Sequence, residues 1–169
     1  MLEGFNFLSV TLDHELMHRA RSSVLCWLAT VDDQGQPNVS PKEIWVVLDE
    51  QHLVIGYIAS PHSVRNIAQC AKVCVSFVDV FVQKGFKVHG EARVIDKGQT
   101  EFSKWAAPLL PMAGERFPLY AVIVVRATAV APILAPSYRL YPQETSEASQ
   151  CQAAMKTYGV RRTDSTGST

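Results

Sequence analysis

The sequence predicts a mainly β fold, a small antiparallel barrel of six strands with flanking helices, and three observations support this. Six segments are rich in β-branched and aromatic residues or alternate apolar with polar residues, as strands do. These segments do not alternate regularly with helices, as the strands of a doubly wound parallel sheet do. The chain has 169 residues, of which 47% are hydrophobic, enough apolar material for one core and too little length for two ordinary domains.

Local patterns assign the helices and strands in order along the chain. The first helix is indicated by Leu12, Leu16 and Arg19, which share one helical face after the N-cap residue Thr11. The strands are separated by turn signals such as residues 32–35, Asp-Asp-Gln-Gly. The expected helices cover residues 11–22, 61–70, 98–113 (broken at its prolines) and 147–158. The expected strands cover residues 24–31, 37–48, 52–58, 72–80, 86–95 and 119–130, with a turn or bulge at the glycine of residues 82–85.

Composition divides the chain into two parts. Residues 1–136 hold all the strand segments and form the barrel domain, whereas residues 137–169 are more polar and form a partly helical C-terminal extension. The end of this extension, residues 163–169, is expected to be disordered.

Charge and hydropathy exclude several classes of protein. Sixteen basic and sixteen acidic side chains cancel, so there is no net field to attract nucleic acid or an anionic membrane. No apolar run approaches the roughly 18–20 residues that cross a bilayer, and the N-terminus lacks the order of a signal peptide. We therefore expect a cytoplasmic protein, with its four cysteines reduced.

Residues 14–18, His-Glu-Leu-Met-His, match the H-E-x-x-H pattern that places two zinc-binding imidazoles on one helical face. A zinc site also needs a third ligand, and His52, His62 and His89 lie on strands or loops with no matching spacing. We therefore expect no metal and an exposed polar helix face here. A zinc hydrolase stays as a distant alternative.

Residues 58–66, IASPHSVRN, are the most informative polar segment, because a strand ends there and a short helix begins. The first amides of a helix are unpaired and its dipole is positive there, so this point attracts phosphate. Candidate ligands around it are Ser60, His62, Ser63 and Arg65. The alternative is an ordinary Ser-Pro helix start with a solvated arginine.

Two further segments carry candidate ligands. Ser40 and Lys42 share one face of the second strand, where the lysine would add a point charge to a phosphate site or would simply protect an edge strand. Residues 83–86, namely Gln83, Lys84, Gly85 and Phe86, offer an amide and backbone groups to the edge of a planar heteroaromatic ring. The alternative for residues 83–86 is a plain turn.

Three motifs in this order, LATVDDQGQPNVSP (28–41), SPHSVRNI (60–67) and KGFKVHGEA (84–92), resemble the pyridoxamine 5'-phosphate oxidase-related FMN-binding split barrels over residues 11–130. The resemblance implies a homodimer with FMN in a groove between subunits. It places the FMN phosphate near Ser40, Lys42, Ser60, His62, Ser63 and Arg65, and the isoalloxazine ring near residues 83–86. In the full oxidases an arginine or lysine pair stands where this chain has His62-Ser63, which leaves Lys42 and Arg65 to supply permanent charge and could reduce FMN affinity.

The resemblance further implies an FMN-dependent oxidoreductase, a flavin reductase or a reducer of small conjugated molecules, with NAD(P)H as the donor. The alternative is a non-catalytic protein of the same fold that binds flavin, haem or F420. Pyridoxal phosphate is not the expected substrate, because Tyr138-Arg139-Leu140 is only a fragment of the C-terminal motif of the true oxidases. FMN itself carries the hydride chemistry, so no catalytic residue is assigned.

Overall fold

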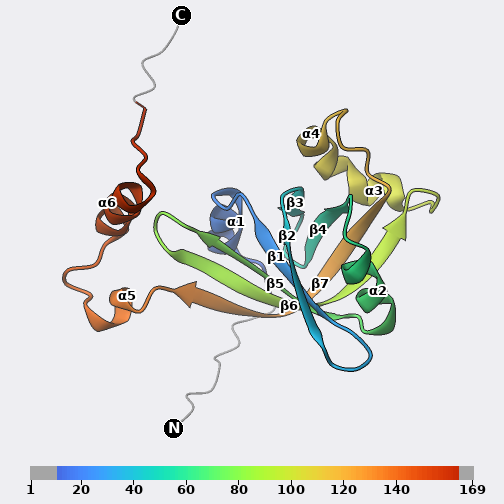
Figure 1. Ribbon diagram of the computed structural model, residues 1–169, viewed down its shortest axis with the longest axis horizontal. Helices are drawn as coiled ribbons and strands as arrows, with labels where there is room; N and C mark the ends of the chain where they lie inside the picture. The colour runs from blue at the N-terminus through green and yellow to red at the C-terminus, as the bar shows by residue number, and fades with distance from the viewer. Residues whose placement is uncertain (1–10, 164–169) are drawn as a thin grey trace, which may run out of the picture.

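A single antiparallel sheet of seven strands, in the order β2-β1-β5-β6-β7-β4-β3, runs through residues 11–163, the part of the chain that the computed structural model describes. The sheet curls into a half-barrel with helices at its ends and on its faces (Figure 1). The predicted fold class, a mainly β split barrel with flanking helices, is therefore confirmed. The strands are β1 (Cys26–Val31), β2 (Pro37–Lys42), β3 (Trp45–Val47), β4 (His52–Tyr57), β5 (Lys72–Asp79), β6 (Lys84–Asp96) and β7 (Ala121–Leu134).

The seventh strand arises because the single strand predicted for residues 37–48 is divided after Lys42. Its first part, β2, pairs with β1 at one edge of the sheet, and its second part, β3, pairs with β4 at the opposite edge. Pro37 and Pro41 have no N–H group, which confines β2 to an edge. The chain thus crosses the open side of the curled sheet at residues 43–44, directly after Lys42.

Helices occur in all four predicted regions, but the region predicted for residues 98–113 begins at Phe102 and is divided into three pieces, and a short helix at residues 137–140 was not predicted. They are α1 (His14–Arg21), α2 (Pro61–Gln69), α3 (Phe102–Ala106), the 3-10 turn η1 (Ala107–Leu109), α4 (Leu110–Ala113), α5 (Ser137–Leu140) and α6 (Glu147–Tyr158). The N-cap of α1 is Asp13 and not Thr11, because the Asp13 carboxylate accepts the Leu16 amide at 2.9 Å. None of the helices within residues 11–163 has the length and apolar character needed to cross a membrane.

The sheet carries an apolar cluster on each face. One cluster includes Leu16 of α1 and Phe77 of β5, and the other includes Trp105 of α3 and Leu109 of η1. Strand β7 contributes to both clusters, because alternate residues such as Val122 and Ile123 are buried on opposite faces. This two-sided burial explains why its sequence is a nearly continuous run of apolar residues.

The turn between β5 and β6 differs from the prediction, which placed a turn or bulge at Gly85. The turn lies at residues 80–83, and Gly85 is already paired within β6. A Cβ atom at Gly85 would lie 2.0 Å from the Phe77 carbonyl oxygen, so this glycine is required by the close approach of two strands. The irregularity in β6 lies instead between His89 and Gly90.

The C-terminal segment leaves β7 at Leu134 and forms α5 and α6, beside the turn between β5 and β6 (Figure 1). Helix α6 coincides with the helix predicted for residues 147–158. The predicted disorder of residues 163–169 falls, except for Thr163, outside the described residues. The division of the chain at Pro136 stays a prediction.

Candidate cofactor site

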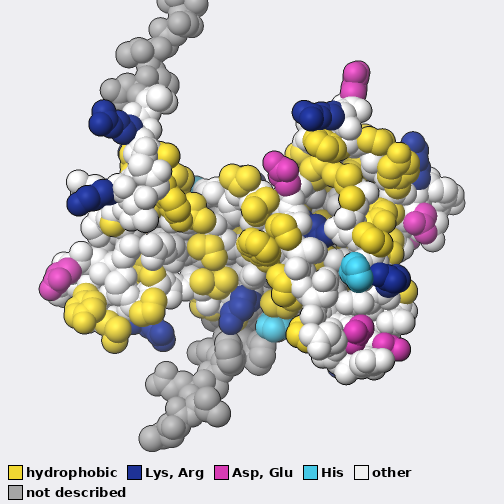
Figure 2. All heavy atoms as spheres, viewed as in Figure 1, with side chains coloured by type: hydrophobic (Ala, Val, Ile, Leu, Met, Phe, Trp, Pro, Cys, Tyr) yellow, Lys and Arg dark blue, Asp and Glu magenta, His cyan; other side chains and the backbone are white. Residues whose placement is uncertain are grey.

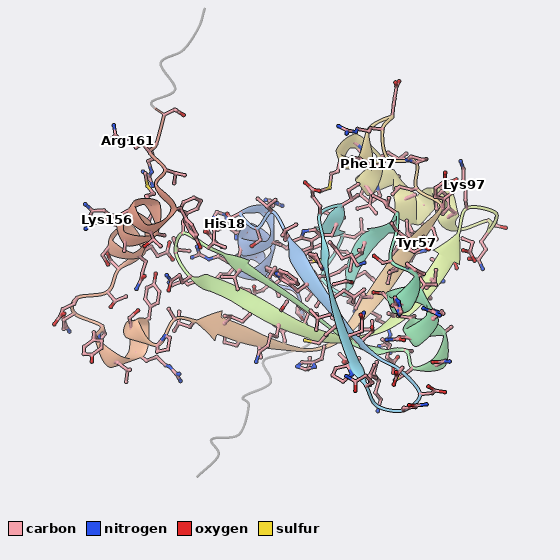
Figure 3. All side chains as sticks on the ribbon, viewed as in Figure 1. His18, Tyr57, Lys97, Phe117, Lys156 and Arg161 are labelled. Atoms are coloured by element: carbon pink, nitrogen blue, oxygen red, sulfur yellow. The ribbon has the colours of Figure 1, made fainter. Side chains whose placement is uncertain are left out.

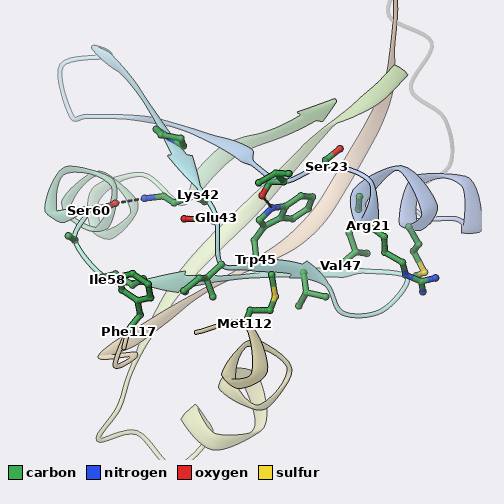
Figure 4. Close-up of a pocket in the computed structure, with 18 residues that line it drawn as sticks. Arg21, Ser23, Lys42, Glu43, Trp45, Val47, Ile58, Ser60, Met112 and Phe117 are labelled. Atoms are coloured by element: carbon green, nitrogen blue, oxygen red, sulfur yellow. Dashed lines mark hydrogen bonds between the residues drawn. The ribbon is translucent and has the colours of Figure 1, made fainter. Parts of the chain in front are cut away.

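A cavity of about 720 Å³ lies on the open side of the barrel, where the chain crosses between β2 and β3. Lys42 and Ser60 lie at one end and Arg21 lies at the other (Figure 4). Trp45, with the half-exposed Met112 and Phe117, supplies an apolar wall between these ends. The volume is typical of small-molecule sites, and a mainly apolar wall with a few polar groups is typical of their lining.

Lys42 is the most unusual polar residue of the cavity. Its side chain is only 6% exposed, and its ammonium donates a hydrogen bond to the Ser60 hydroxyl. Burial lowers the pKa of Lys42 from its ordinary value, because the charged form loses hydration. None of the ion pairs within the described residues includes Lys42. A buried ammonium without a carboxylate partner favours a bound anion.

The start of α2 lies beside this ammonium. Ser60 is the N-cap residue, but its side chain makes no capping hydrogen bond and instead accepts a hydrogen bond from the Lys42 ammonium. Pro61 in the first turn has no N–H group, so the amides of the next two residues point out of the helix without a side-chain cap. The positive end of the helix dipole and the Lys42 ammonium thus act on the same point.

The other four predicted phosphate ligands surround the first turn of α2 but do not line the cavity. The hydroxyls of Ser40 and Ser63 are 3.1 Å apart, and Ser63 is buried, so the pair holds β2 against α2. Arg65 is exposed, and its guanidinium donates to Nδ1 of His62 at 3.1 Å. The structure therefore gathers all six residues at one place, with Lys42 and Ser60 facing the cavity.

Three residues of this region were missed by the sequence analysis. The Asn66 amide donates to the Thr30 hydroxyl at 3.1 Å, and the Asn38 amide donates to Thr30 at 3.4 Å and to Ser63 at 3.5 Å. Thr30 and Asn66 are buried, so this network fixes α2 on β1 and β2. The available signal was that Asn66 shares a helical face with Ser63, three residues earlier.

Residues 83–86, which were predicted to contact the edge of the ring, do not line this cavity. Figure 1 shows the turn between β5 and β6 at the left of the sheet and α2 at the right. Phe86 is buried with its ring centroid 6.2 Å from that of Phe77, and the Lys84 ammonium is 2.9 Å from the Glu147 carboxylate. The Gln83 side chain is exposed, and its backbone has a φ of +55°. Within one chain, residues 83–86 therefore do not join Lys42 at the cavity.

The H-E-x-x-H motif lies on α1, where His14 and His18 are exposed. Within residues 11–163, no group of three or more His, Cys, Asp or Glu side chains is arranged to hold a metal ion. The four cysteines are free thiols.

The family model described as pyridoxamine 5'-phosphate oxidase matches residues 12–133. A structure of a provisionally assigned pyridoxamine 5'-phosphate oxidase from Lactobacillus delbrueckii is 28% identical, with a TM-score of 0.61 over 72% of this chain and 94% of that chain. No curated protein matches the sequence significantly.

Two further solved structures share the fold at lower identity. An FMN-binding protein from Syntrophomonas wolfei is 18% identical, with a TM-score of 0.59 over 73% of this chain and 90% of that chain. HutZ, the haem storage protein of Vibrio cholerae, is 16% identical, with a TM-score of 0.58 over 73% of this chain and 94% of that chain.

Proposed function

The chain belongs to the pyridoxamine 5'-phosphate oxidase family, and we propose that it is an FMN-dependent oxidoreductase that holds the FMN phosphate at Lys42 and the start of α2. The observation that carries this proposal is the buried Lys42 ammonium, which has no carboxylate partner among the described residues and lies beside an uncapped helix N-terminus. A phosphate dianion would supply the missing negative charge and would accept hydrogen bonds from the free amides at the start of α2. The residues present therefore fit FMN.

The protein's own contribution is binding, orientation and the exclusion of water. Lys42 and Ser60 would hold the phosphate, with Ser40, Ser63, His62 and Arg65 in support. The apolar wall of the cavity suits a planar ring system. FMN when bound supplies the hydride chemistry, so the substrate class we propose is a small conjugated molecule or a free flavin, with NAD(P)H as the donor.

We also propose that the site is completed by a second copy of the chain. Residues 83–86 do not line the cavity that Lys42 lines, so a partner's copy of these residues would be needed to bring them to the same FMN. Figure 2 shows hydrophobic side chains gathered around α3 and α4, where Leu110, Met112 and Phe117 are exposed. Large exposed apolar patches are typical of surfaces that bind other proteins.

An FMN titration tests the cofactor and its phosphate site. Lys42→Met should weaken FMN binding about 10- to 100-fold, because a charge-assisted contact to the phosphate is lost. The same change should raise the free energy of unfolding of the FMN-free protein, because it removes a buried unpaired charge. The control is Lys97→Met, since Lys97 is exposed, does not line the cavity and points outward (Figure 3). Equal FMN affinity in Lys42→Met and wild type would refute the phosphate site.

Spectra and turnover separate the enzyme from a binding protein. FMN-loaded protein should oxidise NADH or NADPH with a small quinone as the acceptor, whereas a storage protein would bind FMN without turnover. A Soret band after haem addition, with no binding of FMN, would favour a haem-binding protein of the same fold.

Mixed dimers test whether the site is shared. The Lys42→Met variant is mixed with a Gln83→Gly variant under conditions that allow subunit exchange. If each site takes Lys42 from one copy and Gln83 from the other, the mixed dimer regains one intact site. If both residues act within one copy, the mixture binds FMN no better than the two separate variants.

A further inference from the structure

The turn between β5 and β6 has a strained backbone. The backbone amide of Gln83 donates to the Asp79 carbonyl at 2.8 Å. The Asp79 carboxylate accepts hydrogen bonds from the backbone amides of Phe81 at 3.0 Å and Val82 at 3.4 Å. Gln83 has a φ of +55° and is the one residue other than glycine with a positive φ among residues 11–163. A side chain is disfavoured in this conformation, so other contacts must maintain it.

The C-terminal segment, residues 135–158, supplies such contacts. The Ala135 amide donates to the Gln83 carbonyl at 3.1 Å, and the Tyr138 hydroxyl donates to the Val82 carbonyl at 2.8 Å. Two consecutive carbonyl groups of the turn are therefore fixed from outside the hairpin. The ring of Tyr158 also contacts that of Phe81, with centroids 6.1 Å apart.

Glu147, in the first turn of α6, joins the segment to β6 and to α1. Its carboxylate accepts the Lys84 ammonium at 2.9 Å and the Arg19 guanidinium at 2.5 Å. Arg19 is only 8% exposed, so its charge has little access to water. The Lys84 ammonium also lies 4.6 Å from the centroid of the Tyr138 ring. The segment is thus held by charges on α1 and β6.

Among residues 83–86, Gln83 is the one whose polar side chain is left without a contact within the described residues. Lys84 is paired, Gly85 has no side chain, and Phe86 is buried. The Gln83 side-chain amide is exposed, and it makes no hydrogen bond within the described residues. An amide offers one acceptor oxygen and two donor hydrogens, which match the nitrogen and oxygen atoms on the edge of a flavin ring.

We propose that the C-terminal segment is a clamp that holds the turn in its strained form, so that Gln83 presents its amide to the flavin ring of the partner subunit's site. This inference rests on the proposed FMN-binding function. Gln83 is the group that would contact the cofactor, and Tyr138 and Glu147 are positioning residues. The strain at Gln83 is the reason for the clamp, because a turn free to relax would move the amide.

Substitution of Gln83 tests the contact. Gln83→Gly relieves the strain and removes the amide, so the FMN-free protein should melt at a higher temperature while FMN binding weakens about 2- to 10-fold. The visible spectrum of bound FMN should shift at the same time. Gln83→Asn keeps an amide and tolerates a positive φ, so it should restore part of the wild-type spectrum. A Gln83→Gly variant with wild-type affinity and spectrum would overturn the proposal.

Substitutions in the segment test the clamp. Tyr138→Phe and Glu147→Gln should speed hydrogen exchange at the amides of residues 81–83 in the FMN-free protein, and should shift the FMN spectrum in the direction of Gln83→Gly. Glu144→Gln is the matched control, because it makes the same charge change in an exposed side chain of the same segment. Unchanged exchange in the Tyr138→Phe, Glu147→Gln double variant would show that the segment does not hold the turn.

The two proposals fail differently. If wild-type protein binds no FMN, the proposed function and the role of Gln83 at the ring are both wrong, and the exchange experiment still decides whether the clamp exists. If wild-type protein binds FMN but the Gln83 and segment variants bind it equally, with the same spectrum, the function stands and the clamp inference is overturned.

Discussion

The barrel and the C-terminal segment are held by different forces. In the barrel, two apolar clusters contain many fully buried side chains, among them Leu28, Phe77 and Ile123. In the segment, α5 buries no residue and α6 buries only Ala154. The segment depends instead on a few polar contacts from Tyr138 and Glu147.

This difference separates folding from positioning. Burial of apolar area is large in sum and tolerates small movements, so it is suited to fixing a fold. Polar contacts contribute only about 1 kcal/mol each, but they are directional, so they are suited to fixing the position of one group. The family model matches residues 12–133, which include the barrel and exclude the segment. We therefore expect changes in the segment to leave the fold intact.

The largest expected effect is the loss of a core side chain. Phe77→Ala should lower the free energy of unfolding by about 3–5 kcal/mol, because it leaves a cavity in the larger apolar cluster. Tyr158→Ala, at an exposed aromatic contact of the segment, should cost no more than about 1 kcal/mol. Urea denaturation of both variants provides the measurement. Similar losses would mean that the segment is part of the core structure.

A smaller effect is expected where two strands approach closely. Gly85→Ala should destabilise the protein by about 1–3 kcal/mol, because the added Cβ meets the Phe77 backbone, which cannot move without breaking the β5–β6 pairing. Gly98→Ala is the matched control, since nothing lies within 4 Å of its Cβ position. Thermal unfolding of the two variants would distinguish them. Equal melting temperatures would show that the strands can separate at Gly85 without cost.

The sequence was informative where one local pattern decides the outcome. The valine-rich run of β7 predicted that strand, and the S-P-H-S segment predicted the start of α2. The break after Lys42 was not predictable, because a curled sheet decides it by placing β2 and β3 at opposite edges. Gly85 was placed in a turn because glycine also marks turns, whereas the contact that requires it comes from Phe77, eight residues earlier.

The candidate site shows the same division. Lys42 and Ser60 could be predicted as neighbours because a strand and a helix start carry them in a recognisable order. The network of Thr30, Asn38 and Asn66 depends on how α2 packs on β1 and β2, which no local pattern reports. The clamp on residues 79–84 joins parts of the chain that are more than fifty residues apart, so it required the structure.

The smallest expected effect is a pH dependence of the segment. Hydrogen bonds from Lys84 and then Arg19 lower the pKa of Glu147 below its ordinary value. A carboxyl group whose pKa is lowered by folding stabilises the folded state above its unfolded pKa of about 4.3, and this stabilisation is lost as the pH falls through the lower folded value. The Glu147 side chain is 43% exposed, so solvent screening limits the contribution to about 1 kcal/mol or less.

The difference in unfolding free energy between wild type and Glu147→Gln measures this contribution. It should be constant near neutral pH, should shrink below about pH 4.3 as the carboxylate takes up its proton, and should also decrease with added salt. Glu144→Gln should show no such trend, because no ion pair to Glu144 occurs within the described residues. A difference that stays constant through the acid range would mean that the charge of Glu147 does not hold the segment, and that α6 is attached by packing as the barrel is.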